Sequence, residues 1–257
     1  LLGNALDDAL FGNDGNDLLR GRSGADHLDG GNGIDHATYN DQTADLILHL
    51  DGTPGSGAAA QGDTLVGIEA LTTGSGNDTL YGSTGADTLN AGAGSDTIYG
   101  GDGNDAIYGG AGADTIDGGD GVDRAIYTDQ TADLTLYLDG TPGSGGAAQG
   151  DVLIAVENIS GGSGNDTIYG NEASNVLHGY AGSDQLYGGD GDDVLQGWGG
   201  ADLIDGGNGS DRAIYSDVTV DTVIYLDGRA GEGGAAGDVL VSVENVNGGG
   251  GRDTIHG

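Results

Sequence analysis

The sequence has no cysteine and no methionine, and it has only two prolines, one tryptophan and one phenylalanine. No disulfide can therefore hold the fold. Six basic residues face 42 acidic ones, for a formal net charge of −36, so nucleic acid and anionic membranes would be repelled and divalent cations attracted. No apolar run reaches the roughly 18 residues that a membrane-spanning helix needs, so we expect no membrane insertion.

Glycine is the most unusual component of the composition. It occupies 58 of the 257 positions, several times the ordinary usage, and large apolar residues are few. A chain of this kind cannot bury an ordinary core, and its self-repulsion should keep it expanded in the absence of cations. With disulfides excluded, bound metal is the candidate that could hold such a fold together.

Two adjacent nonapeptides at residues 100–108 and 109–117 show the organising motif, G-G-x-G-x-D-x-U-x, where U is a large aliphatic residue. Glycine at positions 1, 2 and 4 permits positive φ angles, so the first six residues can form a loop whose carbonyl groups point inward. Calcium takes about six to eight oxygen ligands, which the position-6 carboxylate and several carbonyls can supply. The x-U-x triplet predicts a very short strand with U on one face.

This repeat resembles the calcium-binding nonapeptide of RTX (repeats-in-toxin) proteins, which are exported by type I secretion. The resemblance implies an all-β fold, a right-handed parallel β-roll or β-helix solenoid with Ca²⁺ bound in the glycine-rich turns. Two nonapeptides then make one coil, so equivalent residues of alternate nonapeptides stack on adjacent turns. Each ion is expected between a position-6 aspartate and its counterpart one turn later.

A longer period of 88 residues overlies the nonapeptides, as Asp35, Asp123 and Asp211 show. Each unit has six nonapeptides and an insert of about 34 residues. The repeat blocks lie at about 3–38, 73–126 and 161–214, with a fourth from 248 to 257, and the inserts at about 39–72, 127–160 and 215–247. We expect residues 1–257 to form one continuous solenoid belonging to a longer protein.

Nearly every nonapeptide has aspartate at position 6. The predicted metal ligands are Asp17, Asp26, Asp35, Asp78, Asp87, Asp96, Asp105, Asp114, Asp123, Asp166, Asp184, Asp193, Asp202, Asp211 and Asp253. Pairing each aspartate with its counterpart two nonapeptides later predicts about nine to twelve Ca²⁺ ions, enough to cancel much of the negative charge. Asp8 is in a doubtful loop because Leu6 replaces its third glycine, and the loop with Asn175 at position 6 should be weak or vacant.

The U residues, such as Leu80, Leu89, Ile98 and Ile107, predict two facing ladders and a thin core. We expect the inserts to continue the parallel stack as wider, irregular turns; a separate small domain is the alternative. Asp151, Glu157 and their counterparts either bind further calcium or are solvated or hydrogen-bonded carboxylates.

Other chemistry finds little support. The five histidines do not recur in register and no H-E-x-x-H motif occurs, so we expect no catalytic site. Tyr180 and Trp198 replace the second glycine of their repeats, and these repeats are separated by one other nonapeptide. They should stack on successive turns, either as mutual packing or as a contact for a saccharide or a neighbouring molecule.

Three functions fit a calcium-dependent coil. The first is a structural rod segment of a long secreted or cell-surface bacterial protein, such as an adhesin, a surface layer or an extracellular filament, with copies associating end to end or side by side. The second is the secretion and folding module of an exported enzyme or toxin whose active site lies elsewhere. The third, ice binding through a Thr/Asn array, requires more regularity than position 7 shows. In the first two, the resemblance to RTX proteins implies that the chain stays unfolded in the cytosol and folds on calcium outside.

Overall fold

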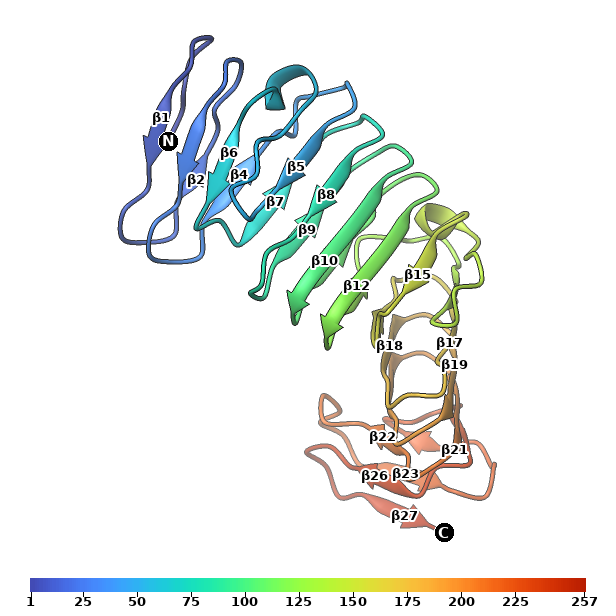
Figure 1. Cartoon of the computed structure of the whole chain (residues 1–257). Coiled ribbons are helices and arrows are strands. Elements are labelled where there is room, and N and C mark those ends of the chain that lie inside the picture. The colour runs from blue at the N-terminus through green and yellow to red at the C-terminus, as the bar shows by residue number, and fades with distance from the viewer. The chain divides into compact units, whose positions relative to one another are not determined.

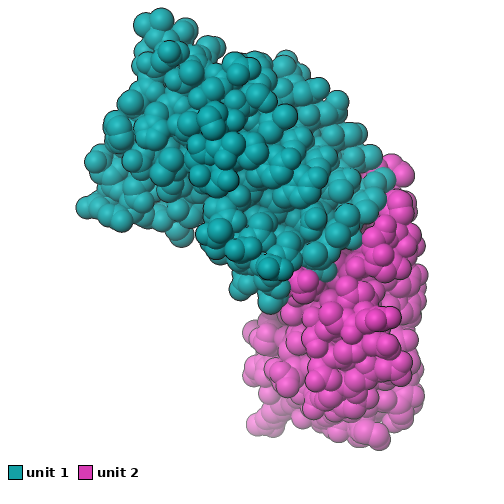
Figure 2. All heavy atoms as spheres, viewed as in Figure 1, with its two compact units in different colours: residues 1–125, 150–156 teal, residues 126–149, 157–257 magenta.

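The computed structural model describes residues 1–257 and divides into two compact units, residues 1–125 with 150–156 and residues 126–149 with 157–257 (Figure 2). Figure 1 shows short strands that follow one another in stacked layers, with two short 3-10 helices. No helix is long and apolar enough to cross a membrane.

The strands of the first unit are mostly three residues long, as the x-U-x triplet predicts. They are β1 (Ala9–Phe11), β2 (Leu18–Leu19), β3 (His27–Asp29), β4 (His36–Thr38), β5 (Ile47–His49), β6 (Thr64–Val66), β7 (Ala70–Thr72), β8 (Thr79–Tyr81), β9 (Thr88–Asn90), β10 (Thr97–Gly103), β11 (Ala106–Tyr108), β12 (Thr115–Gly121), β13 (Arg124–Ile126, whose last residue belongs to the second unit) and β15 (Val152–Ile154), with the 3-10 helix η1 (Ala58–Ala60).

The second unit has the same construction. Its elements are β14 (Thr135–Tyr137), η2 (Gly146–Ala148), β16 (Asn158–Ser160), β17 (Thr167–Tyr169), β18 (Val176–Ala181), β19 (Gln185–Asp190), β20 (Val194–Gly199), β21 (Leu203–Asn208), β22 (Arg212–Ile214), β23 (Thr222–Tyr225), β24 (Glu232–Gly233), β25 (Val239–Val241), β26 (Asn245–Asn247) and β27 (Thr254–His256).

The strand register confirms a parallel β-roll with one coil per two nonapeptides. In the first unit Ile98 of β10 lies opposite Leu80 of β8 and Ile116 of β12, its counterparts two nonapeptides before and after it. In the second unit Leu186 of β19 lies between Ile168 and Ile204 with the same spacing. Consecutive strands of the nonapeptide blocks therefore alternate between two sides of the roll, one formed by an 11-stranded sheet and the other by four shorter sheets, and each strand hydrogen-bonds to strands one coil away. The pairs are parallel, except that β24 pairs with β23 antiparallel.

The core is a narrow double ladder of the U side chains between the two sheets. Leu80, Leu89, Ile98 and Ile107 are fully buried in the first unit, and their equivalents in the second are equally buried. Each coil contributes about two aliphatic side chains to this core, so burial contributes only a few kcal/mol per coil against the ordering of some 18 residues.

The inserts widen the roll without leaving it, as expected. In the first insert, β5 pairs with β8, β6 with β3 and β7 with β4, each across a longer stretch of chain than the two nonapeptides of a regular coil. Leu46, Leu48 and Leu50 point inward as an alternating strand face, and Leu134, Leu136 and Leu138 do the same in the next insert. Because the insert strands hydrogen-bond to repeat strands, the insert is not a separate small domain. Whether the two units form one continuous solenoid stays a prediction.

Candidate metal-binding turns

The position-6 aspartates lie inside the roll, at the turns between its two sheets. Of the fifteen predicted ligands, thirteen have at most 2% of their surface exposed, and Asp17 and Asp253 are partly exposed. Burial of so many carboxylates without basic partners is unusual, since an unpaired buried charge costs several kcal/mol. The ion pairs Arg20–Asp41 and Asp227–Arg229 lie outside the predicted ligands.

One oxygen of each buried carboxylate has a structural role. The backbone N–H of Asp78 donates to Oδ1 of Asp96, and the N–H of Asp96 donates to Oδ1 of Asp114 at 2.9 Å. The same bond joins Asp166 to Asp184 and Asp184 to Asp202 in the second unit. Most position-6 residues inside the blocks are thus bonded through their side chains to the main chain one coil earlier, but Oδ1 of Asp87 and of Asp253 has no such partner. The position-6 side chains line up along the roll.

The other carboxylate oxygen has no such partner. An oxygen that is buried and accepts no hydrogen bond occurs in Asp26, Asp35, Asp78, Asp87, Asp96, Asp105, Asp114, Asp184, Asp193, Asp202, Asp211 and Asp253. In nearly all of them it is Oδ2. Buried polar atoms normally have partners, so a row of unpaired anionic oxygens indicates that a cation belongs beside them.

The glycines leave room for that cation. A Cβ atom added to Gly100, at position 1, would lie 2.4 Å from Oδ2 of Asp105 and 2.3 Å from the carbonyl oxygen of Gly118 one coil later. The same two kinds of oxygen converge on Gly188, where Oδ2 of Asp193 and the carbonyl of Gly206 lie 2.2 and 2.5 Å from the added atom. Carboxylate and carbonyl oxygens therefore border one small space at each turn, and hard cations prefer this oxygen set.

The raised pKa values of the buried aspartates also indicate that a cation belongs in these turns. Burial, followed by the charges of neighbouring aspartates, raises the pKa of Asp96 and of Asp184 to about 7. Burial likewise raises the pKa of Asp105, Asp193 and Asp202 to about 6. Without a cation, the fold stabilises the protonated form of these groups, whereas a divalent ion beside Oδ2 would stabilise the ionised form.

The site is built from main-chain oxygens as much as from side chains. No group of three or more His, Cys, Asp or Glu side chains gathers in a metal-binding arrangement. A site here would combine one or two carboxylates with loop carbonyls, as the glycine pattern predicts.

Asn175 shows what a turn does without a carboxylate. Its Oδ1 accepts the N–H of Asn171, its Nδ2 donates to the carbonyl of Glu157, and its own N–H donates to Oδ1 of Asp193. Both Oδ1 and Nδ2 of the amide therefore have hydrogen-bond partners within the protein. This agrees with the expectation of a weak or vacant turn, which stays a prediction.

Asp8, Asp87 and Asp166 differ from the other position-6 residues. In each, Oδ2 accepts the N–H of position 2 in the same loop, from Asn4, Ser83 or Gly162. This local bond was not foreseen. All three loops follow an insert coil or stand in the first coil, but Asp78 also follows an insert coil and its Oδ2 has no such bond.

The acidic residues of the inserts are hydrogen-bonded. Asp63 and Asp151 accept, through Oδ1, the N–H groups of Asp26 and Asp114. Glu69 and Glu244 accept those of Asp35 and Asp211 through Oε2. These residues complete the ladder across the wide turns. The alternative of hydrogen-bonded carboxylates is therefore the one that the contacts favour.

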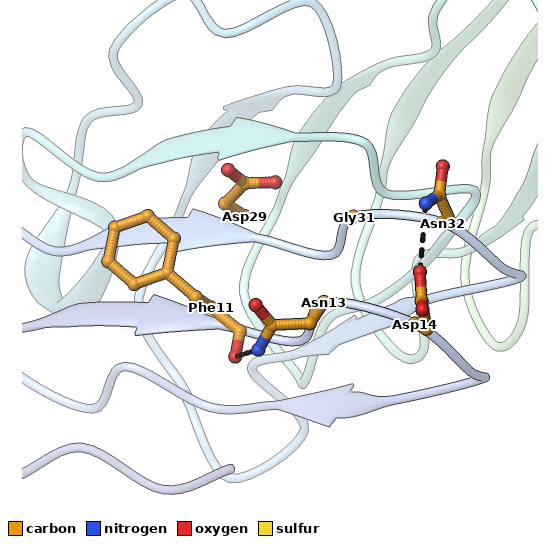
Figure 3. A pocket seen from close by; sticks show the side chains of 6 residues that line it. All are labelled: Phe11, Asn13, Asp14, Asp29, Gly31 and Asn32. Carbon is orange, nitrogen blue, oxygen red and sulfur yellow. Dashed lines mark hydrogen bonds between the residues drawn. The ribbon is translucent and has the colours of Figure 1, made fainter.

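Two further features lie on the outside of the roll. Tyr180 and Trp198 stack with ring centroids 4.3 Å apart, and His178 meets Trp198 edge-on, so the predicted stacking is confirmed. An open hollow of about 490 Å³ in the first unit is lined by Phe11, Asn13, Asp14, Asp29, Gly31 and Asn32 (Figure 3). Asn32 already donates to Asp14 there at 2.9 Å. Both features include position-2 residues of calcium-type loops: Tyr180 and Trp198 follow Gly179 and Gly197, which border Oδ2 of Asp184 and of Asp202.

Comparison with known proteins agrees with this geometry. A comparison with curated proteins gives no match. The RTX calcium-binding nonapeptide repeat matches residues 2–37, 63–98, 72–106, 91–125, 156–186, 178–213 and 243–257, which together cover well over half of the chain. The matches fall on the turns that hold the buried aspartates, and the chain belongs to the family of RTX calcium-binding nonapeptide repeat proteins.

Proposed function

We propose that this calcium-binding repeat region is a structural rod segment of a longer secreted or cell-surface protein and that it folds when calcium binds after export. The observation that carries the proposal is the row of buried, unpaired aspartate oxygens along each unit. At neutral pH, a fold that buries so many ionised carboxylates beside one another needs cations to offset their charge. The family is structural rather than catalytic.

The ligands in this proposal are the position-6 carboxylates together with the carbonyls that border the same spaces. Oδ2 of Asp105 and the carbonyl of Gly118 illustrate the pair of donors in the first unit. Bound calcium supplies two positive charges at each occupied turn. About nine to twelve ions would offset 18 to 24 units of the net charge of −36, if each supplies two positive charges.

The repeat construction supports a rod. Each coil hydrogen-bonds only to the coils before and after it, so a roll of this kind lengthens by copying units. The long period repeats both the nonapeptide block and its insert. A secretion and folding module attached to an enzyme or toxin remains the second candidate. The sequences that flank this region in the full protein separate the two: further copies of the long unit favour the rod, and a catalytic domain favours the module.

Calcium titration of the chain tests the proposal. In EGTA the chain should be expanded with little β signal, and millimolar Ca²⁺ should give a parallel-β circular dichroism spectrum and a smaller radius of gyration by X-ray scattering. Mg²⁺ should substitute poorly because it is smaller and releases its waters reluctantly. A chain that is equally folded in excess EGTA would contradict the proposal.

A further inference from the structure

The carboxylate of Asp63 in the first insert occupies the same kind of position as a nonapeptide aspartate. Its Oδ1 accepts the N–H of Asp26 at 2.8 Å, as Oδ1 of Asp114 does for Asp96. Asp63 is 1% exposed, so its second oxygen is as deeply buried as those of the repeat turns. Unlike most of those oxygens, Oδ2 of Asp63 has a hydrogen-bond partner.

Oδ2 of Asp63 accepts a hydrogen bond from the Tyr39 hydroxyl at 2.7 Å. Tyr39 is itself only 2% exposed, so the pair is closed to solvent. In most nonapeptide turns the corresponding oxygen has no partner. The tyrosine hydroxyl therefore satisfies the atom that would face a cation elsewhere in the roll.

The loop that leads to Asp63 also differs in construction from a nonapeptide loop. Residues Ala58–Ala60 form η1, with the side chains of Ala59 and Ala60 buried, where a nonapeptide would have a glycine loop. A Cβ atom added to Gly62 would meet the methyl group of Ala25, and one added to Gly55 would meet the carbonyl oxygens of Ile47 and Ala60. No Asp63 oxygen is among the nearest atoms at either glycine, so this loop does not bring a carboxylate and a carbonyl oxygen to one space as the Gly100 loop does.

The same construction recurs in the other inserts. Tyr127 and Tyr215 follow Tyr39 at the interval of the long repeat. Asp151 and Asp238 accept the N–H groups of Asp114 and Asp202 through Oδ1, each at 2.9 Å. Before Asp151 the segment Gly146–Ala148 is again a 3-10 helix with buried alanines. Tyr215 is also buried near Asp238, but its hydroxyl has no hydrogen-bond partner, so in the third insert the two groups are neighbours without a formed bond.

We propose that Tyr39, Tyr127 and Tyr215 determine where the calcium array stops, because their hydroxyls take the place of the cation beside Asp63, Asp151 and Asp238. This inference rests on the proposed calcium-binding function and specifies which acidic turns do not take part in it. Each insert then closes one coil without metal. The calcium-loaded blocks of nonapeptides are separated by metal-free coils at fixed intervals.

The number of bound ions tests this assignment. Asp63→Asn, in the complete chain, keeps an Oδ1 acceptor for Asp26 and gives Tyr39 a neutral amide partner. Native mass spectrometry in calcium should count the same number of ions as in the wild type. Asp105→Asn is the matched control in a nonapeptide turn and should lose at least one ion. Loss of an ion from Asp63→Asn would overturn the inference.

The role of the hydroxyl needs a second pair of variants. Tyr39→Phe leaves Oδ2 of Asp63 buried, charged and without a donor, so the calcium midpoint for folding should shift upward with the ion count unchanged. Adding Asp63→Asn to Tyr39→Phe removes that charge and should shift the midpoint back toward the wild type. A midpoint unmoved by Tyr39→Phe, or a double variant worse than the single one, would also overturn it.

These outcomes are separate from those of the proposed function. If the wild type bound no calcium, the proposed function would fail before any variant was compared. If the wild type bound calcium and Asp63→Asn and Asp105→Asn lost equal numbers of ions, only the assignment to tyrosine would fail.

Discussion

The N–H of Asp96 donates a 2.9 Å hydrogen bond to Oδ1 of Asp114, the residue at the same repeat position one coil later. As a result of this bond, the two oxygens of the carboxylate have different roles. Oδ1 fixes the side chain against the neighbouring coil, and Oδ2 is left buried without a hydrogen-bond partner. Main-chain geometry thus aligns the anionic oxygens along the roll before any cation is considered.

Asp114→Asn should separate these two roles. The amide keeps an oxygen for the N–H of Asp96 but loses the charge at Oδ2, as Asn175 does naturally. We expect the loss of at least one Ca²⁺ ion. The corresponding loss of stability is about 1.4 kcal/mol per site at a calcium concentration ten times the dissociation constant. Native mass spectrometry and thermal melting in calcium measure the two effects.

Asp102→Asn is the control for Asp114→Asn. Asp102 is exposed at position 3 of its repeat, so removal of its charge should leave the ion count unchanged. Equal ion counts in the wild type and Asp114→Asn would show that Oδ2 of Asp114 holds no metal.

Gly100→Ala should block one turn sterically. The new methyl group would lie 2.4 Å from Oδ2 of Asp105 and 2.3 Å from the carbonyl of Gly118, in the space that we assign to the cation. We expect a higher calcium midpoint and fewer bound ions, measured by circular dichroism titration and native mass spectrometry. Gly199→Ala is the matched control, because a Cβ atom there meets nothing within 4 Å. Similar midpoints for the two variants would contradict the assignment.

Much of this architecture is readable from the sequence, and the reason is its short period. Position 8 of each nonapeptide predicts the buried Leu and Ile ladders, and a shift of two nonapeptides predicts the register of β8, β10 and β12. Position 6 predicts which carboxylates are buried in the turns. Because the repeat is short and regular, the position of a residue within its nonapeptide is enough to predict each of these features.

Repeat positions do not predict the contacts across the inserts. Asp63 reaches Asp26 across an irregular coil that is longer than two nonapeptides, and Tyr39 reaches Asp63 within the same wide turn. The spacing of Tyr39, Tyr127 and Tyr215 is visible in the sequence, but it does not identify their partners. The division of labour between Oδ1 and Oδ2 was also missed, since it depends on side-chain orientation rather than on residue type.

Acid should partly replace calcium in the metal-free chain. The folded state raises the pKa of Asp96 to about 7 and that of Asp105 to about 6, well above the ordinary 3.8. The folded form therefore binds more protons than the unfolded form between about pH 4 and 7, and its stability falls as pH rises through that window. In EGTA we expect more β signal at pH 5 than at pH 7.5 by circular dichroism.

The calcium-loaded form should respond to pH in the opposite direction. Bound calcium requires ionised carboxylates, so protons compete with it and the calcium midpoint should be higher at pH 5 than at pH 7.5. A midpoint independent of pH would contradict a site built on Asp96 and Asp105.

Trp198 offers a reporter inside one calcium-dependent coil. It is the only tryptophan, its φ of 65° is unusual for a bulky residue, and its ring stacks on Tyr180 at 4.3 Å. The stack exists only when β18 and β20 are in register, as the pairing of Tyr180 with Trp198 shows. Tryptophan emission should therefore change at the same calcium concentration as the circular dichroism signal. Tyr180→Ala should alter the emission of the folded form and leave the ion count unchanged, because it removes neither a carboxylate nor a main-chain carbonyl from the turn. An emission change at a calcium concentration well away from the β transition would show that these coils fold apart from the rest.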